Sequence, residues 1–176
     1  MLIDYFKLRD SALDPVRANP SDAGLDVFYC PSDERDSVLI QPGESIVLET
    51  GLKFGVPHGF MLEVKNRSSV ASKMKLVVGA CVIDSGYDGE VFINLHNLGN
   101  ETQIIEAGQK IAQLVMMPVI HFRALETNAS LYDWYPITIS ARGTGALGST
   151  DVTTQKLSEQ MSLGFRWTDA FSQPEE

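Results

Sequence analysis

The stretch Cys81-Val82-Ile83-Asp84-Ser85-Gly86-Tyr87-Asp88-Gly89-Glu90-Val91 is the most informative part of this sequence. An apolar, β-branched run ends in one carboxylate, Asp84, immediately before a tight turn that contains Gly86. An aromatic ring, Tyr87, follows three residues after the carboxylate, and a second strand-like run begins at Val91. The pattern predicts a β-hairpin with free backbone edges, an aromatic wall and a candidate general base at its rim. Such a hairpin could hold a flat heterocycle and activate a water molecule beside it.

Strand-like runs separated by Gly, Pro, Asn and Asp continue on both sides of this stretch. Their short spacing predicts an all-β fold, either a sandwich or a distorted barrel. One short helix is expected over residues 68–73, because Ser68 and Ser69 are N-capping residues followed by helix-compatible ones. The predicted strands are 2–7, 24–29, 38–40, 45–52, 59–64, 76–83, 90–95, 103–105, 110–115 and 119–125.

Composition and charge narrow the class of protein. A chain of 176 residues fits one domain, and 44% hydrophobic residues are typical of a globular protein. The net charge of −9 argues against a nucleic-acid partner bound by a basic surface. No apolar run of about 18 residues is present, so no membrane association is expected. The first residues do not resemble a signal peptide. The two cysteines, Cys30 and Cys81, are expected to be free thiols. Both expectations point to a protein of the cytoplasm, or of the host cytoplasm if the protein is viral.

The end of the chain differs from the rest in composition. Residues 140–151 are rich in Gly, Ser and Thr and are expected to form a mobile arm after a β domain over residues 1–139. The extension 152–176 contains Phe165, Trp167 and Phe171. So many apolar groups predict that it docks on its own domain, on a neighbouring subunit or on a partner protein.

Four further segments have residues suited to binding an anion or a metal. Arg67-Ser68-Ser69 opens the short helix and can complete an anion site, although a capped surface helix explains it equally well. The loop 142–150 has one cation, hydroxyls and accessible N–H groups, and can close over phosphates or serve as a linker. Asp26 can hold a metal-bound water or act as a turn residue, and Gln113 can donate to a phosphate or to a neighbouring strand.

Taken together and in order, these segments resemble the five motifs of the trimeric dUTPase family. The motif-like segments are Ala23-Gly24-Leu25-Asp26, Arg67-Ser68-Ser69, Val82-Ile83-Asp84-Ser85-Gly86-Tyr87, Gly108-Gln109-Lys110-Ile111-Ala112-Gln113 and Arg142-Gly143-Thr144-Gly145-Ala146-Leu147-Gly148-Ser149. They extend over most of the chain, and five motifs in this order are far more specific than any one of them.

The resemblance implies a distorted, jelly-roll-like β-barrel that forms a homotrimer with three shared active sites. It implies hydrolysis of dUTP to dUMP and pyrophosphate with Mg²⁺ as cofactor, which limits uracil in DNA and supplies dUMP for dTMP synthesis. Asp84 would be the base that activates the water, Tyr87 would stack under the deoxyribose, and Asp26 would reach Mg²⁺ through water. The other substrate contacts that it implies are Arg67, Ser68, Ser69, Gly79, Val82, Ile83, Phe92, Gln113, Arg142, Leu147, Gly148 and Ser149, with the arm residues and Thr150 arriving from another subunit.

Two features of this sequence differ from the usual motifs of the dUTPase family, and they leave other functions open. Leu147 stands where the family usually has an aromatic residue that stacks on uracil, and Trp167 or Phe165 could substitute for it. Ser85-Gly86 is closer to dCTP deaminases of similar fold, but Asn94 stands where those enzymes have their glutamate base, and an amide cannot take a proton from water. A catalytically weak regulatory or binding protein on the same fold is the third reading.

Overall fold

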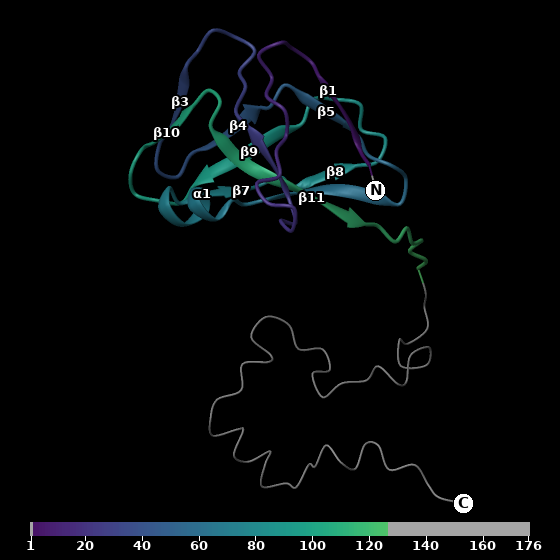
Figure 1. The fold of residues 1–176 in the computed structure, drawn as a ribbon. Coiled ribbons are helices and arrows are strands. Elements are labelled where there is room, and N and C mark those ends of the chain that lie inside the picture. Colours follow the sequence, from purple (N-terminus) through teal and green to yellow (C-terminus); the bar gives the residue numbers. More distant parts are fainter. Residues whose placement is uncertain (1, 127–176) are drawn as a thin grey trace, which may run out of the picture. The chain divides into compact units, whose positions relative to one another are not determined.

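The computed structural model describes residues 2–126. The regular secondary structure of the described part consists of β-strands and one short helix (Figure 1). None of its helices is long and apolar enough to cross a membrane. The elements are β1 (Asp4–Lys7), β2 (Leu25–Phe28), β3 (Ser37–Ile40), β4 (Ser45–Glu49), β5 (Leu52–Gly55), β6 (Phe60–Lys65), α1 (Ser68–Lys73), β7 (Leu76–Val78), β8 (Val82–Asp84), β9 (Phe92–Asn97), β10 (Gln103–Glu106) and β11 (Lys110–Pro118).

The strands form four antiparallel sheets. The largest has the order β2-β11-β6-β8, and a three-stranded sheet has the order β4-β9-β7. Two further pairs, β1-β5 and β3-β10, complete the described part. These sheets do not close into one continuous barrel, so the predicted all-β, jelly-roll-like class is confirmed in its open form.

The core follows from the alternation of side chains along each strand. In β9 the side chains of Ile93, Leu95 and Asn97 point inward and are buried, while the residues between them face outward. Leu62 and Val64 do the same in β6. Asn97 is one of two buried polar residues in the described part, with Thr50, and its amide donates to the backbone oxygens of residues 40 and 101 at 2.9 and 2.8 Å. Because its polar atoms are paired, burial of this amide is compatible with a stable core.

Three predicted strands differ from the observed ones. The run 45–52 is broken into β4 and β5 at Gly51, whose φ of 68° ends the extended conformation. The run 76–83 is broken into β7 and β8, which belong to different sheets. The predicted strand 119–125 is wrong for the described residues, because regular pairing ends with β11 at Pro118. Residues such as Ile120 and Phe122 remain highly exposed there, so they are not packed into the core of the described residues.

The expected hairpin around Asp84 is also corrected. The strand that ends at Asp84, β8, pairs with β6, whereas the strand that follows, β9, pairs with β4 and β7. The turn therefore passes from one sheet to another. Local sequence pattern detected both strands and the turn, but it contains no information on which distant strands take up the free edges.

Candidate active site

The turn after β8 presents Asp84 and Tyr87 to solvent. Both side chains are exposed, and both line a hollow of about 190 Å³ together with Val82, Ile83 and Phe92, and also with Glu90 and Val91. The backbone N–H of Tyr87 donates to the oxygen of Asp84 at 3.3 Å, which closes the turn, and Gly86 has a φ of 84°. An exposed carboxylate thus lies beside an aromatic ring in one hollow, and its role as a base next to a flat ligand stays a prediction.

A second group of predicted site residues lies around Asp26. Its carboxylate oxygens are each paired with a cation: Arg67 Nε lies 2.8 Å from Oδ1 and Lys110 Nζ lies 2.9 Å from Oδ2. The three side chains are partly exposed, between 14% and 33%. Two cations and one carboxylate leave a net positive charge, and the terminal nitrogens of Arg67 are available to an anion.

Gln113 joins this group through the sheet. Gln113 lies opposite Asp26 on β2 and opposite Lys65 on β6. Its amide donates to the backbone oxygen of Asn66 at 2.9 Å, so it holds the segment that leads into Arg67. Gly24 permits this packing, because a Cβ there would lie 2.4 Å from Oε1 of Gln113. The sequence motifs around Asp26, Arg67 and Gln113 thus meet in one place, which their separation along the chain did not reveal.

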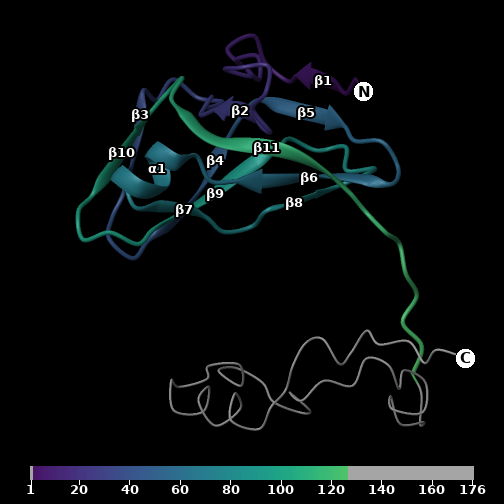
Figure 2. The same ribbon diagram turned by 60° about the horizontal axis from the view of Figure 1, so that its bottom comes forward.

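The turn and the cation group lie at opposite ends of β6. Asp84 pairs with Met61 near the start of β6, whereas Arg67 follows Lys65, the last residue of that strand. The four steps along the strand from Met61 to Lys65 span roughly 13 Å at about 3.3 Å per residue. Figure 2 shows β6 and β8 side by side, with α1 beyond the end of β6. The structure therefore brings the predicted site residues together as two separate halves.

The remaining predicted residues fall on either side of this division. Ser68 and Ser69 are exposed in the first turn of α1, where Arg67 is the N-cap residue but makes no side-chain cap. Gly79 lies close to Asn94 and His96, since a Cβ at this position would lie 2.1 Å from Oδ1 of Asn94 and 2.3 Å from Nε2 of His96. Arg142, Leu147, Gly148 and Ser149 lie outside the described residues, as do the predicted arm and extension.

Lys110 is a contributor that the sequence reasoning missed. The available signal was a cation three residues before Gln113, at the start of β11. Its partner could not be inferred, because the contact with Asp26 depends on the pairing of β11 with β2 and on the register shift between Lys110 and Ala112.

The described residues contain no cluster of three or more His, Cys, Asp or Glu side chains that could hold a metal ion. Asp26 is a hard oxygen ligand of the type that Mg²⁺ prefers, but both of its oxygens already bind cations at 2.8 and 2.9 Å. A carboxylate offers about four lone-pair positions, so a magnesium-bound water can still donate to it. The residues present therefore fit a contact through water and do not fit a site that binds the ion without phosphate.

Comparison with known proteins shows the family of this chain. The family model described as dUTPase matches residues 10–150. Deoxyuridine 5'-triphosphate nucleotidohydrolases of Chlamydia trachomatis serovar L2 and Clostridium acetobutylicum are 34% and 36% identical; they match over 83% and 82% of this chain and over 96% and 92% of their own lengths.

Solved structures agree as well. A mutant dUTPase of Staphylococcus bacteriophage 80alpha with dUpNHpp has a TM-score of 0.71 at 26% identity, covering 86% of this chain and 99% of that one. A mutant dUTPase of phage phi11 of S. aureus, described with a structural Mg(II) ion, has a TM-score of 0.66 at 26% identity, covering 74% of this chain and 99% of that one. This chain belongs to the dUTPase family of hydrolase enzymes.

Proposed function

We propose that this protein hydrolyses dUTP to dUMP and pyrophosphate, and so limits uracil in DNA and supplies dUMP for dTMP synthesis. The observation that carries the proposal is the exposed carboxylate of Asp84 beside Tyr87 in a hollow large enough for a pyrimidine ring. A base and an aromatic wall alone would suit many ligands. A separate positively charged group on the same chain, at Arg67 and Lys110, adds what a triphosphate requires.

In this mechanism Asp84 takes a proton from a water molecule. The water oxygen forms a bond to the α-phosphorus, the bond from that phosphorus to the bridging oxygen breaks, and pyrophosphate leaves with the bonding electrons. A general base of this kind contributes roughly 10²–10⁴ in rate. Asp84 suits the role because its side chain is exposed and no ion pair within the described residues holds it.

The phosphates are proposed to lie against the cation end. Arg67 keeps its terminal nitrogens for phosphate oxygens while its Nε is held by Asp26. Ser68 and Ser69 offer hydroxyls at the exposed start of α1. Gln113 holds the preceding backbone and can also turn toward a phosphate. Arg142, Leu147, Gly148 and Ser149 are proposed to complete the site from the arm.

Mg²⁺ is proposed to arrive with the triphosphate and to contact Asp26 only through water. When bound, the ion would neutralise charge on the phosphate oxygens and so lower the repulsion of the attacking oxygen. Asp26 supports this role as a partly buried carboxylate whose inner positions are taken by Arg67 and Lys110.

A homotrimer with shared sites is proposed on the separation of the two halves along β6. A single chain carries the turn and the cations at opposite ends of β6, roughly 13 Å apart along the strand. A closed ring of copies in head-to-tail contact would bring the turn of one subunit to the cations of the next.

A cytoplasmic location is also proposed. The two cysteines, buried Cys30 and half-buried Cys81, are free thiols, which is typical of proteins in a reducing compartment.

Deamination of dCTP receives less support. Asn94 holds the place of the deaminase base, and its amide donates to the backbone oxygen of Ile46 at 3.2 Å. Its Oδ1 lies 3.0 Å from Nε2 of His96, so the side chain is engaged within the sheet. It is therefore a structural amide and not a free acid–base group.

The test is an assay of purified protein with dUTP or dCTP and Mg²⁺, measuring both pyrophosphate and ammonia. We expect pyrophosphate from dUTP alone. Asp84→Asn should abolish turnover, a loss of roughly 10²–10⁴, while a non-hydrolysable dUTP analogue still binds. Ammonia from dCTP would favour the deaminase, absence of both products would favour the binding protein, and loss of analogue binding in Asp84→Asn would make this residue structural.

A further inference from the structure

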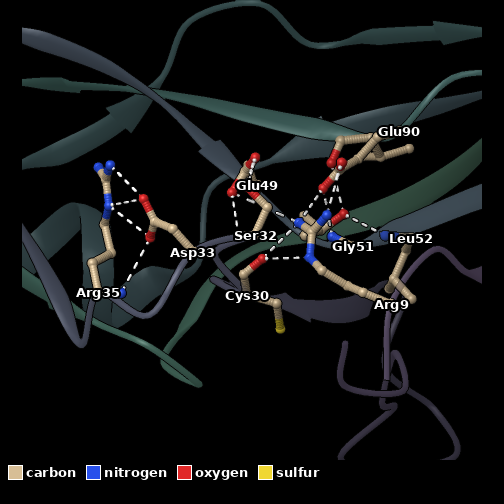
Figure 3. A network of polar contacts seen from close by, with 11 residues as sticks. Arg9, Cys30, Ser32, Asp33, Arg35, Glu49, Gly51, Leu52 and Glu90 are labelled. Carbon is tan, nitrogen blue, oxygen red and sulfur yellow. Dashed lines mark hydrogen bonds and ion pairs between the residues drawn. The ribbon is translucent and has the colours of Figure 1, made fainter. Parts of the chain in front are cut away.

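The segment that leaves the Asp84 turn ends at Glu90, whose carboxylate is held by an arginine from a distant part of the chain. Glu90 Oε1 accepts hydrogen bonds from Arg9 Nη2 at 2.6 Å and from the backbone N–H of Gly51 at 2.7 Å. Glu90 Oε2 accepts a third from Arg9 Nη1 at 3.2 Å. The two side chains are only 13% and 19% exposed, and Figure 3 shows them facing each other. A bidentate pair with a backbone donor fixes the carboxylate in one position.

Arg9 is fixed in turn by the backbone. Its Nε and Nη2 donate to the oxygen of Cys30 at 3.2 and 2.7 Å. The pair therefore ties the segment after β1 to the residues after β2 and to the loop between β4 and β5. The neighbouring residue Val91 is held as well, because its oxygen accepts from Thr50 Oγ1 at 2.6 Å and its N–H donates to Leu52 at 2.8 Å.

Tyr87 rests on this anchored segment. Its hydroxyl donates to the backbone oxygen of Glu90 at 2.9 Å. The ring also lies directly over Gly89, where a Cβ would be 2.4 Å from the phenol oxygen. Tyr87 is 47% exposed, so few other contacts fix the direction of its ring. Glu90 lines the same hollow as Asp84 and Tyr87.

We propose that Glu90, held by Arg9, is a positioning residue that fixes the ring of Tyr87 and thereby sets the discrimination between 2′-deoxyribose and ribose. The inference rests on the proposed function, in which the sugar packs on that ring. If the Tyr87 ring is fixed against the sugar, no space is left for a 2′-hydroxyl. A ring that is free to tilt would leave that space and admit ribose.

The test compares dUTP with UTP as substrates of Glu90→Gln. The glutamine keeps the size of the side chain and an acceptor for Gly51, but it removes the charge that Arg9 pairs with. We expect the ratio of kcat/KM for dUTP to kcat/KM for UTP to fall about tenfold. Tyr87→Phe removes only the hydroxyl from a half-exposed ring, leaves the fold intact and should lower the same ratio.

Glu49→Gln is the matched control. Glu49 Oε2 lies 3.8 Å from Arg9 Nη2 and its carboxylate binds Ser32, but no contact joins it to the turn. In Glu49→Gln the ratio of kcat/KM for dUTP to kcat/KM for UTP should equal that of the unmodified protein. A ratio that is unchanged in folded Glu90→Gln or in Tyr87→Phe, or that falls equally in Glu49→Gln, would overturn the proposal.

A second readout does not depend on turnover. In protein labelled with 3-fluorotyrosine, the ¹⁹F resonance missing from Tyr87→Phe identifies Tyr87. We expect it to move toward the position of free 3-fluorotyrosine in Glu90→Gln and to stay in place in Glu49→Gln. An unmoved resonance in Glu90→Gln would refute the positioning role. A protein that hydrolyses no dUTP would instead refute the proposed function, and the ring measurement would still decide the positioning role.

Discussion

At one end of β6 an exposed carboxylate, Asp84, stands beside an aromatic ring, and at the other end two cations share the carboxylate of Asp26. The first region is a turn between two sheets, with its ends anchored and its middle open to solvent. The second is built across three paired strands, with side chains that hold one another. The difference indicates that the turn is suited to a reacting group and a flat ring, and the sheet to fixed positive charge.

The largest expected effect comes from mixing two inactive variants. Asp84→Asn removes the base and Arg67→Gln removes the phosphate-binding cation, so each variant alone should be nearly inactive. If sites form between subunits, co-refolded mixtures regain sites in which both residues are intact. With equal, random mixing in a closed ring we expect about one quarter of the unmodified activity.

The control for this experiment is the same mixture combined after folding, without exchange of subunits. Activity that stays at the level of the separate variants, even after co-refolding, would place both halves of a site on one chain and contradict the shared site. Sedimentation of the mixture measures the oligomeric state in the same samples.

A smaller effect is expected when the cation end alone is disturbed. Asp26→Asn removes the charge that orients Arg67 and Lys110, and we expect kcat/KM for dUTP to fall about tenfold to hundredfold. If Asp26 also meets Mg²⁺ through water, the half-saturating magnesium concentration should rise. Asp22→Asn is the matched control, since Asp22 caps the backbone N–H of Asn19 at 2.9 Å and makes no ion pair with the site cations. Wild-type kinetics in Asp26→Asn would remove this residue from the site.

The smallest expected effect is on the stability of the protein at high pH. It involves Tyr29, which directly follows β2, the strand that carries Asp26. Burial raises the pKa of the Tyr29 phenol above its ordinary value. Because the folded-state pKa is the higher one, the unfolded chain loses its proton first as pH rises. The contribution of Tyr29 is therefore complete below about pH 10 and declines above it.

Tyr29→Phe removes this ionisation. The urea midpoint of the variant should fall less than that of the unmodified protein between about pH 9 and pH 11. Parallel curves would mean that ionisation of this phenol does not limit alkaline stability.

Local patterns in the sequence predicted much of the fold. Alternation and turn residues located most strands within a residue or two, and the short helix spans the predicted residues 68–73. Its expected capping is not observed, because Arg67 is the N-cap residue and the two serines lie within the first turn. The errors have two causes. The break at Gly51 is local and follows from the positive φ of that residue. The split of 76–83 depends on which distant strand offers a free edge, and single-strand patterns do not contain that information.

The candidate site shows the same limit of what the sequence can predict. Asp84 was detectable from the local pattern, because a carboxylate before a glycine turn is unusual at the end of an apolar strand. The roles of Asp26, Arg67 and Gln113 were predicted only from the resemblance to the dUTPase family. The division of these residues into two groups was not detectable, since it follows from the register of β6 with β8 and β11. The Arg9–Glu90 pair was missed for the same reason, because 81 positions of sequence separate its members.

The alternation of β6 limits how the distance between its two ends can change. Leu62 and Val64 face the core, so inserting or deleting one residue would turn an apolar side chain outward and a polar one inward. Only changes of two residues preserve the buried face, and each alters the spacing by roughly 6.6 Å. The distance between the Asp84 carboxylate and the two cations can therefore change only in steps of two residues within β6. Smaller changes in this distance require changes in the loops at the ends of the strand.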